Sequence, residues 1–358
     1  MAVTGGAVAA SGNYYSSRAL GQVDSIQLKT SNDQLNPAVA KGPTAVENYL
    51  LVGSDSRTGA DPTDVDFGGI GTKVSGHRSD TMLVLRYDPA TKRAALLSVP
   101  RDLWVVLADT GRKDRVNEAF DRDDPTVRSQ NLLDTISKTL EIPIHHYVEV
   151  NFAGFKTLVN ALGGVNIWID YPIRDTHTGL EVFAKAQSCV LLDGVSARQY
   201  VRSRSIDELR NGKWVRDETS DYGRMARQRD FISRAINKAA SKVTSDPLSL
   251  GQMLKAVASS VRKDDGIDLD GLAQQFKGAA SDTALSFQLP TRPEMISGNS
   301  VLLLEAVAAK PILDIFRGIA PMVEAASATT APPAAAPAPT PAPAPSVPAT
   351  VDPSASCR

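Results

Sequence analysis

The chain of 358 residues has little cysteine and little histidine, and no excess of charge of either sign. Its two cysteines, Cys189 and Cys357, are too few for a disulfide scaffold and lack the spacing of a zinc motif. One bridge between them and two free thiols are both compatible with the sequence. The 39 Lys and Arg residues face 40 Asp and Glu residues, which disfavours a nucleic-acid-binding protein.

Several functional signatures are also missing. No stretch contains the roughly 20 consecutive apolar residues that a membrane-spanning helix needs. Neither the phosphate-binding pattern GxxxxGK[ST] nor the dinucleotide-binding pattern GxGxxG occurs. The adjacent His145 and His146 lack metal-ligand spacing to another histidine, so we expect them to have a structural or surface role.

Composition divides the chain into three parts. Residues 1–44 show no clear periodicity and are predicted to be a linker, whose small apolar stretch 2–10 is either a simple tail or the outer end of a membrane anchor. Residues 45–321 are predicted to form the folded domain. Residues 322–358 form a tail rich in proline and alanine, which is predicted to be disordered because such a composition cannot bury a core.

Strand and helix patterns alternate within the central part. Apolar runs at 49–52, 81–87 and 94–99 predict a strand followed by a hairpin, with Pro89 setting the turn. Helical spacing of apolar residues predicts helices over 132–140, 155–162 and 224–242, and alternation predicts a half-buried strand over 165–169. The expected fold class is α+β, with a central mixed, largely antiparallel sheet flanked by helices in an α/β/α arrangement.

Three pairs of charged residues stand at the ends of strands that we expect to be neighbours. They are Asp55 with Arg57, Arg78 with Asp80, and Arg101 with Asp102. Each pair alone is typical of a polar turn. Together they indicate a site, because the ends of neighbouring strands are where open sheets often place functional side chains.

Residues 198–229 are unusually rich in arginine, with eight arginines and one lysine against five acids. Arg202 and Arg204 point the same way in an extended chain, and Arg224 and Gln228 share a helix face. A solvated, ion-paired surface is the alternative to a binding site, but such a surface uses lysine freely. Arginine is the side chain suited to bidentate binding of phosphate oxygens. With the nearby carboxylates, the cluster predicts a phosphate site bridged by Mg²⁺.

Seven segments in order resemble the LytR-CpsA-Psr family of bacterial envelope proteins, over about residues 48–240. The segments are YLLVGSDSR, GHRSDTMLVLRYDP, LLSVPRDLWV, DRVNEAF, IPIHHYVEVNFAGFKTLVNALGGVNIWID, LLDGVSARQYVRSR and DYGRMARQRDFI. The resemblance implies a phosphotransferase that moves a glycopolymer from a polyprenyl-pyrophosphate carrier to a peptidoglycan hydroxyl and leaves a phosphodiester link. It also implies a membrane anchor at the N-terminus, a catalytic domain outside the cytoplasm and a hydrophobic slot for the lipid.

The resemblance assigns roles by position. Asp55 and Asp80 are expected to bind Mg²⁺ (or Mn²⁺), and either of them or Asp102 could act as the general base. The residues expected to bind the pyrophosphate are Arg78, Arg101, Arg202, Arg204, Arg224 and Gln228. Those with less defined roles in substrate binding are Arg57, Asp102, Asn117, Asp221 and Arg227. The long segment 58–77 departs from the family pattern and is expected to form a lid or an acceptor loop.

The lipid slot is expected to lie between the helix over 152–162, the strand over 165–169 and the helix that begins at Arg224. The alternative is that Phe152, Phe155, Leu158 and Trp168 simply fill the core.

Water in place of the sugar hydroxyl would give hydrolysis, so a pyrophosphatase side activity is also expected of the transferase. Two other functions remain open: a secreted Mg²⁺-dependent pyrophosphatase, and a non-catalytic regulator that binds an anionic polymer. Arabinogalactan, teichoic acid and capsule polysaccharide are all open as the glycopolymer. The composition rich in alanine and proline favours an actinobacterial source and hence arabinogalactan.

Overall fold

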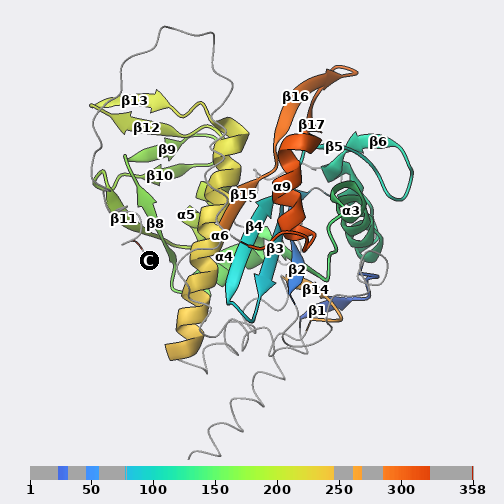
Figure 1. Cartoon of the computed structure of the whole chain (residues 1–358). Helices are drawn as coiled ribbons and strands as arrows, with labels where there is room; N and C mark the ends of the chain where they lie inside the picture. Colours follow the sequence, from blue (N-terminus) through green and yellow to red (C-terminus); the bar gives the residue numbers. More distant parts are fainter. Residues whose placement is uncertain are drawn as a thin grey trace, which may run out of the picture.

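The fold is built around a seven-stranded sheet in a computed structural model (Figure 1). The structure describes residues 23–30, 46–55, 77, 79–245, 261–267, 285–322 and 357. In spatial order the strands are β1 (Asp24–Ile26), β14 (Val261–Asp264), β7 (His146–Asn151), β2 (Glu47–Ser54), β3 (Ser79–Asp88), β4 (Arg93–Ser98) and β15 (Leu285–Gln288).

The sheet is mixed, as predicted. The pairs β14–β7, β2–β3 and β3–β4 are antiparallel. The pairs β1–β14, β2–β7 and β4–β15 are parallel. The predicted hairpin is confirmed as β3 and β4, whereas the antiparallel share of the whole sheet is smaller than expected. The parallel partners come from segments far away in the chain, which local patterns do not detect.

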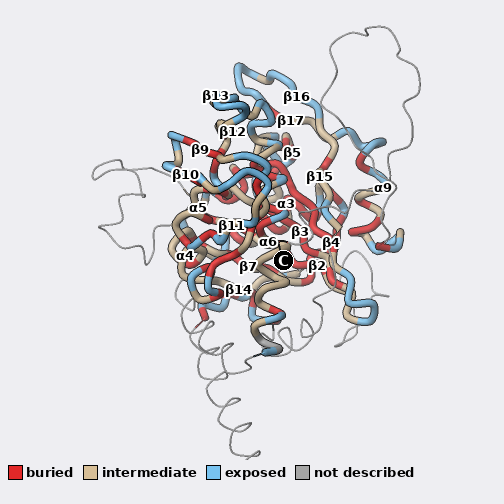
Figure 2. The backbone as a smooth tube through the Cα atoms, turned by 90° about the vertical axis from the view of Figure 1, so that its left-hand side faces the viewer, coloured by how far each residue is buried: buried red, intermediate tan, exposed pale blue. Residues whose placement is uncertain are grey.

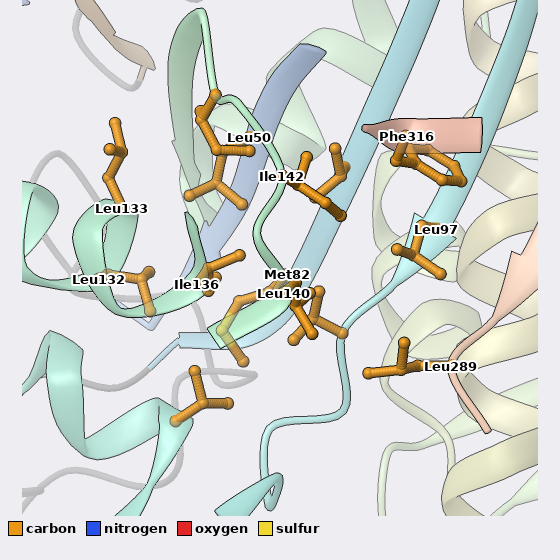
Figure 3. Close-up of a cluster of buried hydrophobic side chains, with 14 of the residues drawn as sticks. Leu50, Met82, Leu97, Leu132, Leu133, Ile136, Leu140, Ile142, Leu289 and Phe316 are labelled. Carbon is orange, nitrogen blue, oxygen red and sulfur yellow. The ribbon is translucent and has the colours of Figure 1, made fainter. Parts of the chain in front are cut away.

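Helices cover both faces of the sheet. On one face lie the 3-10 helix η2 (Val116–Phe120), α3 (Pro125–Leu140) and α9 (Ala306–Phe316). Figure 3 shows Leu50, Met82 and Leu97 of the sheet beside Ile136 of α3 and Phe316 of α9. The other face is covered by α4 (Phe152–Ala161) and α6 (Ser220–Ser245). Figure 2 shows the buried backbone of the central strands in red between these layers.

A second layer of structure packs beyond α4 and α6. It contains α5 (Gly194–Arg202) and the two-stranded sheet of β8 (Val165–Ile169) and β11 (Ser188–Leu192). It also contains a four-stranded sheet of β10 (Leu180–Val182), β9 (Ile173–Asp175), β12 (Asp207–Arg210) and β13 (Lys213–Arg216). One buried cluster joins these elements to α4 and α6 through Val159, Ile167, Ala197 and Phe231.

Two further hairpins complete the described part of the chain. They are β5 (Trp104–Val106) with β6 (Lys113–Arg115), and β16 (Thr291–Ile296) with β17 (Asn299–Leu304). None of the helices within the described ranges is long and apolar enough to cross a membrane.

The predicted domain boundaries need correction at both ends. Residues 24–26, placed in the linker, form the edge strand β1, and Val23 and Ile26 are buried. A strand of three residues is too short to show periodicity, which is why the sequence did not reveal it. At the other end Cys357, placed in the disordered tail, is 1% exposed. Of the predicted linker the structure describes residues 23–30, and of the predicted tail it describes Met322, which is also buried, and Cys357; their other residues lie outside the described part of the chain.

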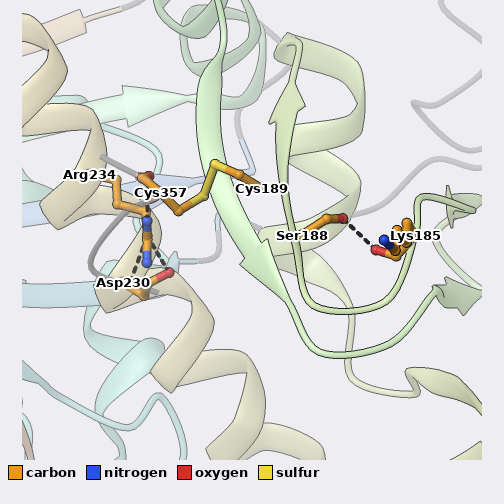
Figure 4. Close-up of a disulfide and its surroundings, with 6 residues drawn as sticks. All are labelled: Lys185, Ser188, Cys189, Asp230, Arg234 and Cys357. Atoms are coloured by element: carbon orange, nitrogen blue, oxygen red, sulfur yellow. Dashed lines mark hydrogen bonds and ion pairs between the residues drawn. A yellow bond between two sulfur atoms is a disulfide. The ribbon is translucent and has the colours of Figure 1, made fainter. Parts of the chain in front are cut away.

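The two cysteines form a disulfide that fastens the end of the chain to β11 (Figure 4). Arg234 of α6 donates a hydrogen bond to the carbonyl oxygen of Cys357 at 2.9 Å and is itself paired with Asp230. Of the two alternatives for the cysteines, the structure therefore supports the bridge. A stable disulfide is typical of proteins in an oxidising compartment.

The histidine pair has the structural role that the sequence predicts. His145 accepts a hydrogen bond at Nδ1 from the backbone N–H of Asn48, and burial lowers its pKa to about 4. Burial also opposes the charge of His146, but hydrogen bonds to Asp264 and Glu47 raise its pKa to about 9. These contacts tie the start of β7 to β2 and β14.

The two histidines predict opposite effects of pH on stability. Both would titrate near pH 6.5 in the unfolded chain. The contribution of His146 is present below that pH and is lost as the pH rises to about 9, whereas that of His145 is present above it and is lost towards pH 4. In urea unfolding of the wild type, His146 should make the free energy of unfolding fall as the pH rises from 6.5 to 9. We expect this fall to be smaller in His146→Gln. The exposed His177→Gln is the control, and an unchanged slope in His146→Gln would contradict the assignment.

Candidate functional site

A cavity of about 530 Å³ lies between the sheet and the helices α4, α5 and α6. Its walls are apolar along most of their length, with the sheet contributing Leu51, Leu83, Val148 and Val150. The helices contribute Phe152, Phe155, Leu158, Val159, Leu162, Val201, Phe231, Ile232, Ala235, Ile236 and Ala239. Its polar lining consists of Asp80, Thr81, Arg101, Asn151, Thr178, Arg198, Arg202, Arg204, Arg224 and Gln228. The cavity therefore suits a ligand with a long apolar part and an anionic part.

A bulge in the sheet directs Asp80 to this site. Gly53 of β2 pairs with Thr81 of β3, but the next pair is Ser54 with Ser79, so Asp80 is the extra residue. Such bulges often re-aim a side chain next to a functional site. Gly53 eases this close approach, because a Cβ on it would lie 3.1 Å from the Cβ of Thr81 and would force a small shift.

Asp80 is the electrostatic centre of the polar end. Its Oδ1 lies 2.8 Å from Nη1 of Arg101 and 3.9 Å from Nη2 of Arg204. Burial alone would raise the pKa of Asp80, but the hydrogen bond from Arg101 and the charges of Arg101, Arg224 and Arg204 lower it below its ordinary value. The carboxylate is therefore ionised at neutral pH.

The arginines carry more positive charge than the neighbouring acids balance. Nε of Arg204 lies 2.9 Å from Oδ1 of Asp221, and Nη2 of Arg224 lies 3.5 Å from the same oxygen. Arg224 is 4% exposed, and burial lowers its pKa to about 10, with the nearby charges of Arg204 and Arg101 acting in the same direction. A bound anion would relieve this repulsion.

Other polar residues of the cavity lie at the start of α4, at the end of α5 and in the first turns of α6. Cζ of Arg202 lies 4.8 Å from the ring centre of Phe152, so the guanidinium stands over the aromatic face. Gln228 donates a hydrogen bond to the carbonyl oxygen of Val201 at 3.0 Å, which joins the two helices beside the cavity. Asn151 caps α4 by accepting a hydrogen bond from the backbone N–H of Gly154.

Four predicted residues support the site without lining the cavity. Asp221 pairs with Arg204 and Arg224, as described above. Arg227 binds Asp217 and the carbonyl oxygen of Ser203, which fixes the chain after α5. Asp102 pairs with Arg101 and Arg115. Asn117 is buried, and its backbone N–H donates to the carbonyl oxygen of Arg101. These four residues therefore position the arginines.

Three predicted site residues, Asp55, Arg57 and Arg78, are not among the residues seen to line the cavity. Asp55 is half-buried and directly follows β2, but it does not line the cavity. Arg57 and Arg78 lie outside the described residues. The segment 58–77, in which a lid or acceptor loop was expected, also lies outside them except for His77.

Arg198 lines the cavity and was not singled out from the sequence. It is 1% exposed and stands four residues before Arg202 in α5, so the two side chains share a helix face. That spacing was the available signal. The prediction that Arg202 and Arg204 belong to an extended chain is wrong at Arg202, which is the last residue of α5.

The apolar slot partly follows the prediction. α4 and α6 line the cavity with Phe152, Phe155 and Leu158, as expected. The strand β8 does not line it, because Val165, Ile167 and Ile169 are buried in the cluster behind α4. Trp168 is likewise absent from the cavity walls and donates instead to Asp170.

A metal ion at this site would have few ligands from the described side chains. No group of three or more His, Cys, Asp or Glu side chains within the described ranges is arranged to hold a metal ion. Mg²⁺ commonly uses one or two carboxylates and completes its shell with water and substrate phosphate oxygens. An ionised Asp80, with Asp55 at the end of the adjacent strand, fits this smaller donor set.

Fold and site together define a layered α+β domain with an apolar cavity that arginines line at one end. The model of the LytR_cpsA_psr family matches residues 13–316. The chain therefore belongs to the LytR-CpsA-Psr family.

Two curated relatives are similar to this chain. It is 33% identical over 216 residues to "Probable cell wall biosynthesis protein LcpB" of Corynebacterium glutamicum, covering 60% of this chain and 47% of that protein. It is 32% identical over 229 residues to the "Polyisoprenyl-teichoic acid--peptidoglycan teichoic acid transferase TagU" of Halalkalibacterium halodurans. This match covers 62% of this chain and 67% of that protein. The chain thus spans about half the length of the first of these relatives.

Solved structures confirm the fold. The "LytR-Csp2A-Psr enzyme from Actinomyces oris" has a TM-score of 0.59 at 23% identity, with 82% of this chain and 95% of that chain covered. The structure titled "TagT bound to LI-WTA" has a TM-score of 0.59 at 21% identity, with 82% and 98% covered. At these identities the likeness establishes the layered fold alone.

A substitution can test the geometry of the arginine cluster. Arg204→Lys keeps the charge but cannot make the two separate contacts that Arg204 makes with Asp80 and Asp221. We expect the affinity for inorganic pyrophosphate to fall roughly tenfold, the usual cost of a lost hydrogen bond to a charged group. Isothermal titration calorimetry measures it, with Arg210→Lys as the control because Arg210 pairs with Glu208 away from the cavity. Equal affinities for the two variants would show that only net charge matters.

Proposed function

We propose that this protein is a phosphotransferase that moves a glycopolymer from a polyprenyl-pyrophosphate carrier to a hydroxyl group of peptidoglycan. The observation that carries the proposal is the continuity of one cavity, apolar along its walls and lined by five arginines at its polar end. A polyprenyl chain and a pyrophosphate need these two environments side by side. The two relatives are named as a probable cell wall biosynthesis protein and a teichoic acid transferase, and these names support the same function.

The apolar part would bind the lipid through burial. Apolar surface contributes about 25 cal/mol per Å², so a few isoprene units add several kcal/mol. Side chains from α4, α6 and the sheet would enclose the polyprenyl chain, while Arg101, Arg204 and Arg224 would bind the pyrophosphate.

The reaction would break the bond between the bridging oxygen of the pyrophosphate and the phosphorus that carries the glycopolymer. A hydroxyl oxygen of peptidoglycan would form the new bond to that phosphorus and lose its proton. Polyprenyl phosphate would leave, and the polymer would remain joined through a phosphodiester. Charge spreads over the phosphoryl oxygens in such transfers, so catalysis rests on positioning and charge stabilisation. The arginines of the cavity would supply both.

Asp55 and Asp80 would hold Mg²⁺ or Mn²⁺, which when bound would neutralise part of the pyrophosphate charge. Asp80, kept ionised by its arginine neighbours, would also orient Arg101 and Arg204. As general base, Asp102 is disfavoured because both its carboxylate oxygens are in ion pairs. Asp55 and Asp80 remain the candidates.

We place the domain on the extracytoplasmic side of the cell membrane. The disulfide between Cys189 and Cys357 supports this placement, because the cytoplasm keeps most thiols reduced. Peptidoglycan, the proposed acceptor, lies on the same side.

The proposed function is tested by combining purified protein, a polyprenyl-pyrophosphate-linked glycopolymer, peptidoglycan and Mg²⁺. We expect the polymer to become attached to peptidoglycan and polyprenyl phosphate to be released in equal amounts. Asp80→Asn should slow both by at least about a hundredfold, because it removes the charge that organises the arginines, and chelation by EDTA should stop them. Asp109→Asn removes a carboxylate from another ion pair with arginine and serves as the control.

The same assay separates the other functions. Release of polyprenyl phosphate without attachment of polymer would identify a pyrophosphatase, in which water replaces the acceptor. Binding of the donor with no release would identify a non-catalytic binding protein. Full activity in the presence of EDTA would refute the role of the metal.

A further inference from the structure

The four-stranded sheet β10-β9-β12-β13 presents one buried and one outward face. Ile173 of β9 and Val182 of β10 are buried against the cluster around α5, so the alternate residues face outward. Strand register places Arg174, Asp207 and Arg216 in one row of that outer face. The next pair on the same face, two residues along the β12–β13 hairpin towards its turn, is Leu209 with Trp214.

An aromatic pair stands on this outer face. Phe183, directly after β10, is 61% exposed, and its ring centre lies 6.0 Å from that of Trp214 in an edge-on arrangement. Cζ of Arg174 lies 4.2 Å from the centre of the Trp214 ring. The carboxylate of Asp207 lies between two guanidinium groups. Its Oδ1 is 2.7 Å from Nε of Arg216, and its Oδ2 is 3.5 Å from Nε of Arg174. Exposed aromatic side chains that are fixed by their neighbours are a common feature of binding surfaces.

The sheet is attached directly to the polar end of the cavity. The β12–β13 hairpin is inserted in the chain between Arg204 and Asp221, whose side chains pair at 2.9 Å. Thr178, in the turn between β9 and β10, lines the cavity and shares a hydrogen bond of 2.8 Å with Ser203. Figure 1 accordingly shows β12 and β13 beside the end of α6 where its first residues lie. Trp214 is two residues from the base of the hairpin, or about 7 Å along the strand.

The chemistry of this face matches a sugar chain. The C–H face of a sugar ring packs on aromatic rings, and guanidinium groups donate to sugar hydroxyl, acetamido and carboxylate oxygens. A lipid is disfavoured because the row of charged residues beside the rings would lose its hydration. The geometry points to this outer face as the binding site for the sugar chain of the peptidoglycan acceptor, an inference that rests on the proposed function. The acceptor hydroxyl would then reach the pyrophosphate from the side of the hairpin.

Sedimentation with purified peptidoglycan tests the inference separately from catalysis. We expect Trp214→Ala and Phe183→Ala each to weaken binding roughly tenfold, as loss of an aromatic anchor does. Trp214→Phe, which keeps a ring, should restore most of the affinity. Met295→Ala is the control, because Met295 on the β16–β17 hairpin is about as exposed as Phe183. Binding of the polyprenyl-pyrophosphate donor in the absence of peptidoglycan should match the wild type in all four variants.

The outcomes distinguish this inference from the proposed function. Wild-type affinity in both Phe183→Ala and Trp214→Ala would overturn the binding face while leaving phosphotransfer intact, and so would failure of the wild type to bind peptidoglycan. Loss of binding in these two variants, in a protein that transfers no polymer, would support the face and refute the transferase. Phe183→Ala keeps the test decisive if Trp214→Ala fails to fold, because Phe183 lies outside the strands.

Discussion

The ion pairs of Asp80 with Arg101 and Arg204 hold the site together. They bring the turn after β4 and the chain after α5 to one carboxylate on a bulge of β3. Within the described residues Asp80 is the only acid among the cavity walls, whereas five arginines line them. The resulting excess of positive charge lies beside an apolar cavity, where a bound anion would offset it.

The rest of the architecture serves this arrangement. The helices α3 and α9 fill the far face of the sheet with well-packed side chains, so that face carries stability. The near face is only partly filled by Tyr49, Leu85 and Leu96 with α6, and the cavity takes the remaining space. Stability and function thus occupy opposite faces of one sheet. The disulfide fixes the chain end to β11, on the side of the small strands and α6.

The sequence was informative where signals are local. Alternation and helical spacing predicted β2, β3, β4, α3, α4 and α6, because each buries one face along a regular element. Arginine and aspartate at strand ends predicted Asp80 and Arg101 in the site, and the arginine-rich segment predicted Arg204 and Arg224. The resemblance to a family was needed to bring these residues together, since no local pattern shows that the chain after α5 lies beside β3.

The features that the sequence did not reveal depend on distant contacts. β1 exists because it pairs with β14, more than 230 residues later in the chain. The bridge between Cys189 and Cys357 spans 168 residues. The strand β8 has the alternation expected for it, but periodicity does not say which elements pack on its buried face, so its place behind α4 was missed. The aromatic pair of Phe183 and Trp214 likewise arises from tertiary packing.

The central claim is that one cavity binds the lipid while its arginines bind the pyrophosphate. Ala239 lines the cavity about four helical turns along α6 from Arg224, so Ala239→Trp should block the deep part only. The direct measurement is the melting temperature with polyprenyl pyrophosphates of increasing chain length. The account predicts that the shift grows with chain length in the wild type and in the exposed control Ala226→Trp, but stops growing at a shorter chain in Ala239→Trp. A shift independent of chain length in the wild type would contradict it.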